Sequence, residues 1–394
     1  MSVDRTREFR LPGIQDLNKD QDEALALPMD GQHLIIGGPG TGKSVVALLR
    51  ARRLDDTKKT YGTLVYNKLL HHSNRHLFGY DRSFAAMTWD RWFRRHFKRR
   101  LSTDIPTLEP DYPGGYRPID WDAVKQLVQD LEVIEDQCDK FLVIDEGQDM
   151  PPAFYKTLRK LGFKNFYVAA DQNQQIHPEK CSSRQDIQRA LRVRRTGTLE
   201  LKTNYRNTRP IAVLAQHFYP ADPASPRPDL PDSVPTAATP ELWTYGTENT
   251  PTLSAMATGI LKLSDRNPRK LIGIITPNHG VRKKFINALQ RSNPPLDNGK
   301  PPLQTYQSGQ QEVLDFGHGG IMIINAQSCK GLEFDIVILA DIDQHTPKKE
   351  YDLKARFYVM VSRARERVML LRAGDICPVV DGLLPTDPSI LVRK

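Results

Sequence analysis

The sequence has few cysteines and no long apolar run. Its four cysteines stand at positions 138, 181, 329 and 377, and they form no C-x-x-C pair or Cys/His cluster of metal-ligand spacing. No segment approaches the ~18 apolar residues that a membrane helix needs, and residues 1–21 contain no apolar signal core. We therefore expect a soluble cytoplasmic protein that is neither secreted nor membrane-bound.

The charge balance is basic. Lys and Arg number 56 against 47 Asp and Glu, so the formal charge is +9. A polyanionic partner fits this excess, and so does an ordinary basic surface. At 394 residues the chain is long enough for two compact domains rather than one large core.

Short apolar segments bounded by turn residues alternate with segments of helical period. The apolar segments predict buried parallel strands at 33–36, 63–66, 141–145, 166–170, 271–276, 321–325, 335–340 and 368–371. Helices are predicted at 45–54, 123–131, 153–161 and 281–289. This alternation predicts an α/β fold with parallel sheets.

Two proline-dense stretches interrupt the alternation. Residues 220–240 contain seven prolines and residues 293–302 contain four. Neither can be a helix or a central strand, because proline lacks a backbone N–H and has a fixed φ. The first stretch follows a polar cluster at 203–210, and we place a domain boundary near residue 200, between residues 1–200 and residues 201–394.

A glycine-rich loop lies between the first predicted strand and the first predicted helix. It contains Gly37, Gly38, Pro39, Gly40, Thr41, Gly42, Lys43 and Ser44. In such a loop backbone N–H groups surround an anion at a helix N-terminus, Lys43 adds charge at the β- and γ-phosphates, and Ser44 offers a hydroxyl to Mg²⁺. The loop predicts binding of ATP with Mg²⁺; the alternative is a glycine-rich turn that binds no nucleotide.

An acidic pair ends the strand predicted at 141–145. Asp145 can hold Mg²⁺ while Glu146 polarises the attacking water, a division of labour that needs two adjacent carboxylates at one strand tip. A solvated acidic turn is the alternative.

These two motifs and five further segments, in the same order, resemble the superfamily 1 helicases of the UvrD/Rep type. Residues 17–21 are similar to the family element whose glutamine reads adenine, which implies that role for Gln21. Residues 171–176 resemble the third motif, which implies that Gln174 senses the γ-phosphate. Residues 204–206 resemble the fourth, which implies that Tyr205 stacks on the base and Arg206 contacts the γ-phosphate.

Two segments in the second half complete the resemblance. Residues 328–334 are close to the family pattern H-S-x-K-G-L-E-F, which implies Glu333 at the ribose, and residues 358–365 resemble the sixth motif, which makes Arg363 the arginine finger. The resemblance implies two tandem RecA-like domains with ATP in the cleft between them. Opening and closing of that cleft then drives movement. Taken singly, each arginine could instead form an ordinary exposed salt bridge.

The resemblance also implies a nucleic-acid track on the first domain, with single-stranded DNA as the expected partner and RNA as the open alternative. The expected contacts are Tyr66, Asn67, Lys68, Thr88 and Trp89. Tyr66 and Trp89 could stack on bases, or belong to the core. The following helical stretch, 89–100, interleaves aromatic and basic residues. It could grip phosphates, pack Trp92, Phe93 and Phe97 inward, or do both.

The sequence also departs from the family. Only about thirty residues separate the segment ending at 289 from the motif beginning near 321, so the large accessory subdomain of bigger relatives is absent, while about fifty residues between 89 and 141 allow a small helical insertion at about 90–140. The tryptophan that usually follows the third motif is missing, with His177 as a candidate substitute, and Val45 stands where an arginine is common. We expect an ATP-hydrolysing translocase or helicase, and the resemblance implies movement from 3′ to 5′. The alternative is an ATP-dependent switch or recruitment subunit, working with a nuclease or loading protein in repair or in defence against foreign DNA, without unwinding on its own.

Overall fold

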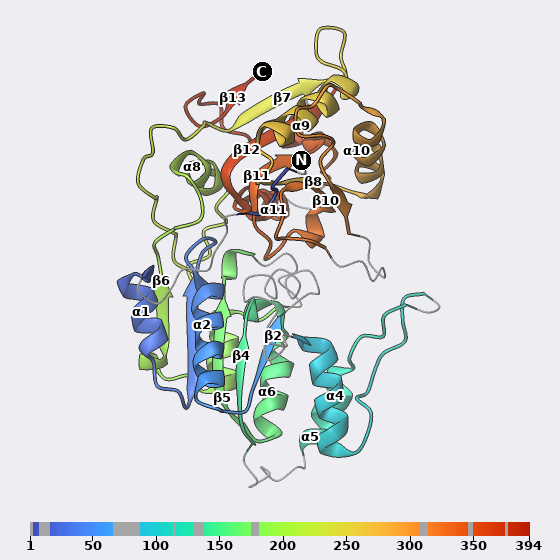
Figure 1. Cartoon of the computed structure of the whole chain (residues 1–394). Coiled ribbons are helices and arrows are strands. Elements are labelled where there is room, and N and C mark those ends of the chain that lie inside the picture. Colours follow the sequence, from blue (N-terminus) through green and yellow to red (C-terminus); the bar gives the residue numbers. More distant parts are fainter. Residues whose placement is uncertain are drawn as a thin grey trace.

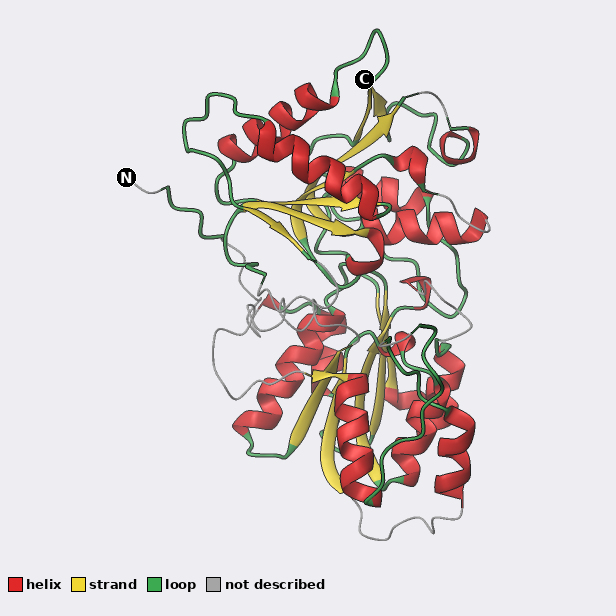
Figure 2. Cartoon of the chain, turned by 90° about the vertical axis from the view of Figure 1, so that its right-hand side faces the viewer, coloured by secondary structure: helices red, strands yellow, loops and turns green. Residues whose placement is uncertain are grey.

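Two parallel sheets, one in each half of the chain, form the structure (Figure 1). The computed structural model describes residues 3–7, 16–65, 87–112, 115–129, 138–174, 181–306, 314–345, 350–374 and 377–394. Every strand pair in both sheets is parallel, and helices cover both faces of each sheet (Figure 2). The α/β fold with two RecA-like domains, expected from the sequence, is confirmed.

The first sheet has the strand order β3-β2-β4-β5-β1-β6. Its strands are β1 (Gln32–Gly37), β2 (Tyr61–Val65), β3 (Met87–Thr88), β4 (Cys138–Ile144), β5 (Phe163–Ala170) and β6 (Thr198–Leu201). On one face it packs against α1 (Lys19–Ala26) and α2 (Lys43–Asp56), and on the other against α4 (Trp89–Leu101), α5 (Trp121–Gln129), α6 (Pro152–Lys160) and α7 (Arg184–Leu191). Alternate residues of β4 serve the two cores, with Leu142 and Ile144 on the α6 side and Val143 on the α2 side.

The second sheet has the strand order β13-β7-β12-β11-β8-β10-β9. Its strands are β7 (Glu241–Tyr245), β8 (Leu271–Thr276), β9 (Leu303–Thr305), β10 (Gly320–Asn325), β11 (Phe334–Leu339), β12 (Ala364–Ala373) and β13 (Val392–Arg393). One core involves α8 (Arg209–His217), α11 (Glu350–Val361) and α12 (Pro378–Asp381), and the other involves α9 (Leu253–Arg266) and α10 (His279–Arg291).

The eight strands expected from apolar runs correspond to β1, β2, β4, β5, β8, β10, β11 and β12. The four expected helices correspond to α2, α5, α6 and α10. The strands that the sequence did not reveal are β3, β6, β7, β9 and β13, which contain two to five residues each. Segments this short carry too few residues for a periodicity to emerge. Neither proline-dense stretch contains a helix or strand, as expected.

Residues 3–7 lie against the second domain, although the chain then continues into α1 of the first (Figure 1). Arg7 Nε donates to Asp335 Oδ2 at 2.9 Å, and Gly319 N donates to Arg5 O at 2.7 Å. The chain passes between the domains again near residues 202–208. There Tyr205 N donates to Gly40 O in the first domain at 2.9 Å, and Thr208 N donates to Arg365 O in the second at 3.1 Å. Within the described residues, no helix is long and apolar enough to cross a membrane.

Candidate nucleotide site

The glycine-rich loop connects β1 to the N-terminus of α2. Gly40 and Gly42 have φ values of 78° and 86°, which are favourable only for glycine. A Cβ on Gly42 would lie 2.2 Å from Gln21 Nε2, and one on Gly40 would lie 2.2 Å from Asn204 Oδ1. Two glycines are therefore required both by the turn and by close neighbours, and the first turn of α2 faces the cleft with its N–H groups toward any bound anion.

Lys43 is buried within this loop. Its Nζ donates to Gly38 O at 2.7 Å and lies 3.7 Å from Asp171 Oδ2. Burial lowers the pKa of the ammonium, although the Asp171 carboxylate acts in the opposite direction. Thr41 Oγ1 also donates to Gly38 O, at 2.8 Å. The Gly38 carbonyl thus holds both side chains in a folded-back position.

Asp145 follows the last residue of β4, beside Ser44. Burial, followed by the charge of Glu146, raises the pKa of Asp145 to about 6, while hydrogen bonding to Ser44 lowers it. The Asp145 Oδ2 atom is buried and has no hydrogen-bond partner. A buried carboxylate oxygen without a donor, next to a hydroxyl, suits a hard divalent cation. The residues present therefore fit Mg²⁺ at Ser44 and Asp145.

Glu146 is held in a left-handed backbone conformation, with φ 53°. Gln148 Nε2 donates to Glu146 Oε2 at 2.6 Å, which fixes the carboxylate. Burial acts to raise the pKa of Glu146, but the charges of Lys330, Lys43 and Arg363 outweigh it and the pKa is lowered. The side chain is therefore an ionised carboxylate at the floor of the site, as activation of a water requires.

The segment after β5 links the acidic floor to the second domain. Gln174 Nε2 donates to Asp171 Oδ2 at 2.6 Å, and Gln174 Oε1 accepts from Arg363 at 2.7 Å. One amide therefore touches both the partner of Lys43 and an arginine of the other domain. A displacement of either side chain is transmitted to the other, as a phosphate sensor requires.

Arg363 lies between α11 and β12 and is only 1% exposed. Its Nε donates to Val359 O at 2.9 Å. Among the described residues, no carboxylate accepts a hydrogen bond from it; its other acceptors are Gln174 Oε1 and Ser362 Oγ. Burial, and then the neighbouring charge of Arg206, lowers its pKa. A buried guanidinium without a bonded anion is costly unless a ligand supplies one.

Arg206 comes from the segment between the domains and points into the second. Its guanidinium pairs with Glu333, and NH1 donates to Ser362 O at 3.4 Å, while its buried Nε has no partner. The charge of Arg206 is among the causes that lower the pKa of Glu333, against the effect of burial. Glu333, expected at the ribose, thus contacts Arg206 in this structure.

Gln21 and Tyr205 both bond to the glycine loop, Gln21 through its side chain and Tyr205 through its backbone N–H. Gln21 Nε2 donates to Thr41 O at 3.0 Å, and Asn18, the N-cap of α1, donates through Nδ2 to Tyr205 Oη at 2.5 Å. Tyr205 is 57% exposed, so one face of its ring is accessible for stacking. The adenine-side pair expected from the sequence is brought together.

Lys330 and Asp149 form a contact between the domains to which no sequence pattern assigned a role. Lys330 Nζ, from the second domain, donates to Asp149 Oδ1 and to Gln174 O of the first, both at 2.6 Å. Both side chains are about 5% exposed. Burial, with Lys330 acting against it, raises the pKa of Asp149 to about 6. The sequence signal that could have found these two residues is their position: Lys330 lies within the motif at 328–334, and Asp149 follows the acidic pair Asp145 and Glu146 by three residues.

The proline-dense stretch also reaches the site, which no sequence pattern indicated. A Cβ on Gly38 would lie 2.1 Å from Pro228 Cγ, so residue 228 packs directly on the glycine loop. Ser225 Oγ donates to Asp171 Oδ1 at 3.4 Å. Residues 225–228 therefore lie over the part of the site between Gly38 and Asp171.

The expected nucleic-acid contacts are only partly visible. Tyr66, Asn67 and Lys68, like the candidate His177, lie outside the described residues. Thr88 is the N-cap of α4. The indole of Trp89 stacks on Trp121 with ring centroids 6.4 Å apart and meets Phe154 edge-on at 5.2 Å. These contacts favour the core alternative for Trp89, and its contact with a strand stays a prediction.

The inward-packing alternative for α4 is confirmed, because Trp92, Phe93 and Phe97 are buried in the core beneath it. That packing leaves the polar face of the helix outside the core.

Comparison with known proteins gives one family match. Residues 320–371, from β10 to β12, match the model of the UvrD-like helicase C-terminal domain. No curated protein sequence matches the chain. Two similar solved structures are the C-terminal domain of a possible DNA helicase from Lactobacillus plantarum WCFS1 and an arterivirus nonstructural protein 10, a helicase solved in complex with DNA.

The Lactobacillus domain is 18% identical to this chain, with a TM-score of 0.33. The matched region covers 48% of this chain and 98% of that domain. The arterivirus helicase is 16% identical to this chain, with a TM-score of 0.36. The matched region covers 93% of this chain, and this chain spans 65% of that helicase. The matched model contains both the segment with Glu333 and the start of β12 beside Arg363. The family match therefore concerns the second half of the chain alone, where residues 320–371 are similar to a UvrD-like helicase C-terminal domain.

Proposed function

We propose that this protein hydrolyses ATP in the cleft between its two domains and uses the opening and closing of that cleft to move along single-stranded DNA, in the 3′ to 5′ direction. The observation that carries the proposal is Arg363, a buried cation that crosses toward the first domain without a carboxylate bonded to it. The triphosphate of ATP supplies the missing anion. Binding then favours the closed cleft, and loss of the γ-phosphate weakens it.

Each side chain has a distinct part in this proposal. Lys43 and the loop amides hold the phosphates, Ser44 and Asp145 hold Mg²⁺, and Glu146 accepts the proton of the attacking water. Gln174, Arg206 and Arg363 act at the γ-phosphate, and Gln21, Tyr205 and Glu333 at the nucleoside. Mg²⁺ would neutralise charge on the phosphate oxygens when bound.

A second candidate function is an ATP-dependent switch that recruits a partner without travelling. It is favoured by the short connection between α10 and β10, in which β9 is the one strand within the described residues. The described residues of this connection form no accessory subdomain that could engage a duplex. In this alternative, the same closure positions a nuclease or loading protein.

The test is ATP hydrolysis by the purified protein alone, with single-stranded DNA and with single-stranded RNA, using Glu146→Gln as the background. Strong stimulation by one kind of strand, lost in the variant, supports the motor and identifies its track. Hydrolysis indifferent to both strands, or absent until another protein is added, refutes the autonomous motor. A lag that grows with strand length in a translocation assay then separates travel from switching.

A further inference from the structure

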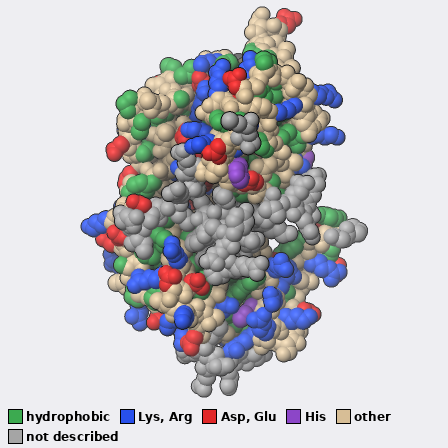
Figure 3. Space-filling view, viewed as in Figure 1, with side chains coloured by type: hydrophobic (Ala, Val, Ile, Leu, Met, Phe, Trp, Pro, Cys, Tyr) green, Lys and Arg blue, Asp and Glu red, His purple; other side chains and the backbone are tan. Residues whose placement is uncertain are grey.

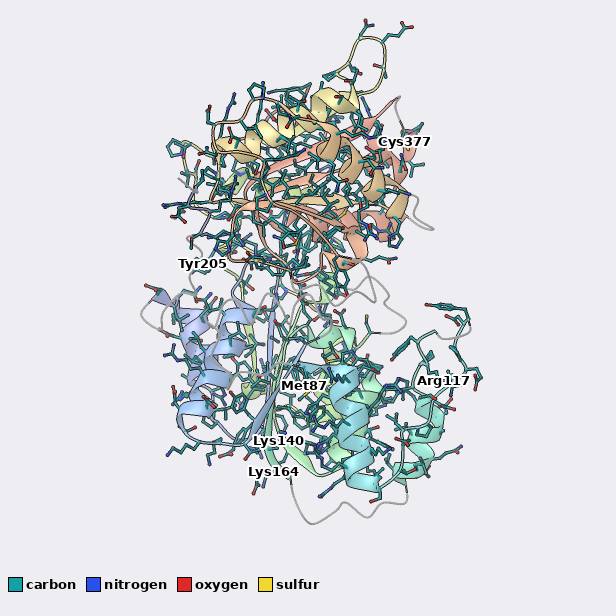
Figure 4. The ribbon with its side chains drawn as sticks, turned by 45° about the vertical axis from the view of Figure 1, so that its right-hand side comes forward. Met87, Arg117, Lys140, Lys164, Tyr205 and Cys377 are labelled. Carbon is teal, nitrogen blue, oxygen red and sulfur yellow. The ribbon has the colours of Figure 1, made fainter. Side chains whose placement is uncertain are left out.

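A basic pocket lies beside α4, away from the nucleotide cleft. It has a volume of about 230 Å³ and is lined by Met87, Trp92, Arg95, His96, Arg99 and Lys140. Met87 and Lys140 lie next to α4 in Figure 4. Four of the six lining residues are basic and none is acidic. In Figure 3, Lys and Arg side chains gather at the lower right, over this helix.

The cations of α4 fall into two groups. Arg94 pairs with Asp90 at 3.0 Å, and Lys98 pairs with Asp104 at 2.9 Å. Arg95 and Arg99 are exposed and form no hydrogen bond or ion pair in the part of the chain that the structure describes. Arg95 and Arg99, which line the pocket, are therefore available to a ligand.

His96 reports the same excess of positive charge. Burial, followed by the charges of Lys140, Arg99 and Arg100, lowers its pKa to about 4. No carboxylate is among the causes. The imidazole is therefore neutral at physiological pH, and it stacks on Trp92 with ring centroids 4.9 Å apart. Neighbouring cations repel one another, a cost that a bound anion lowers.

The pocket has a floor and a spacing suited to a backbone of phosphates. A Cβ on Gly62 would lie 3.5 Å from both Trp92 Nε1 and Lys140 Cε, so the indole N–H and the lysine stem meet at one point. Arg95 and Arg99 are four residues apart on a helix, about 6 Å along its axis. Two guanidiniums at this spacing can each meet a separate phosphate of one strand.

We propose that this pocket binds phosphates of the nucleic-acid backbone and extends the predicted track, which begins at Thr88 and Trp89, along α4 toward Arg99. The proposal rests on the proposed function, since it requires that the protein binds nucleic acid. From Trp89 to Arg99 the helix adds about 15 Å of contact. Because contacts to backbone phosphates carry no sequence information, the contribution of the pocket is independent of sequence.

The test measures the salt dependence of DNA binding by fluorescence anisotropy, for a single strand and for a duplex with a single-stranded tail. The variant is Arg95→Gln with Arg99→Gln. The matched control is Lys262→Gln with Arg266→Gln, which removes two exposed charges at the same helical spacing on α9 of the second domain. Thermal unfolding of each variant checks that the exposed substitutions leave the fold intact.

Loss of two phosphate contacts lowers the slope of log K against log salt by about 1.4 on a single strand and about 1.8 on a duplex. If the variant and the wild type bind equally at 1 M salt, then at 0.1 M salt the variant binds the single strand about 25-fold more weakly and the duplex about 60-fold more weakly than the wild type. The larger loss on one substrate identifies which backbone occupies the pocket.

Two outcomes overturn the proposal, and they differ. If wild-type protein binds DNA and the α4 variant keeps its slope, or loses no more than the α9 control, the pocket is a solvated helix face and the proposed function stands. If wild-type protein binds neither substrate, the proposed function fails and this inference fails with it.

Discussion

Replacing Arg363 with glutamine separates a catalytic arginine from a structural one. The guanidinium is 1% exposed, is held by Val359 O at 2.9 Å and Gln174 Oε1 at 2.7 Å, and has no bonded carboxylate in the described chain. An arginine that stabilises the charge of a transferring phosphoryl group contributes on the order of 10³-fold in rate, or about 4 kcal/mol. We therefore expect kcat to fall about 1,000-fold, while Lys43 and the glycine loop retain most of the ATP affinity.

The same substitution has an opposite effect on the ligand-free protein. Because burial disfavours the charged guanidinium and no carboxylate is hydrogen-bonded to it, Arg363→Gln removes a buried charge without breaking a bonded ion pair. The unfolding temperature without nucleotide should be unchanged or higher, and ATP should raise it less than in the wild type. A structural ion pair would give the reverse result.

The assays are steady-state ATP hydrolysis with saturating single-stranded DNA and thermal unfolding with and without ATP. Arg367→Gln is the matched control, because Arg367 lies four residues after Arg363, on β12. Its partly exposed ion pair with Glu241, at 2.9 Å, contributes at most about 1 kcal/mol. Hydrolysis by Arg363→Gln within tenfold of wild type would refute the reasoning. So would a lower unfolding temperature of the ligand-free variant.

Three further predictions concern the contacts around the cleft and α4. Lys330→Met leaves the buried Asp149 carboxylate without its 2.6 Å partner, so the free energy of unfolding in urea should fall by about 3 kcal/mol. Adding Asp149→Asn should restore most of it, and equal losses in single and double variants would contradict this coupling. Gly38→Ala brings a Cβ to 2.1 Å from Pro228 Cγ and should cost about 1–3 kcal/mol in the same assay, recovered by Pro228→Gly; no recovery would show that the strain lies elsewhere. In the folded protein the pKa of His96 is lowered from 6.5 to about 4. Between pH 6.5 and pH 4 the unfolded chain therefore binds the His96 proton more tightly than the folded protein does. The stability that comes from keeping His96 neutral is present above pH 6.5 and is lost as the pH falls toward 4. Between pH 7 and pH 4 the free energy of unfolding of His96→Gln should therefore rise by about 1–2 kcal/mol relative to wild type, after allowance for solvent screening. Curves of stability against pH that run parallel for the two proteins would contradict this prediction.

The central strands of both sheets could be predicted because they are buried on both faces and read as continuous apolar runs. β8, with all six residues buried, is one example. The edge strands could not, because β3 and β13 have two residues each and owe their conformation to the neighbouring strand. Similarly, α4 could be read as a helix, and its Asp90–Arg94 pair has the i,i+4 spacing of a local contact, but the packing of Trp89 on Trp121 depends on the tertiary structure.

Within the nucleotide site, residues in local motifs could be predicted, and contacts across the cleft could not. The sequence indicates Lys43 and Asp145 because the strand, loop and helix that position them are contiguous. Pro228 has no such signal: its place on Gly38 results from the path of a segment with neither helix nor strand. The pairing of Lys330 with Asp149 joins residues 181 positions apart, a relationship that periodicity does not reveal.

The position of residues 3–7 on the second domain has a consequence for the order of events during synthesis. These residues are made before their partners Asp335, at 2.9 Å from Arg7, and His318, bridged to Thr6, which follow more than 300 residues later. At about 5–20 residues per second, the docking site emerges roughly 15–60 s after the segment that binds it. The first domain therefore has time to fold while residues 3–7 wait undocked, and their docking is among the last steps of maturation.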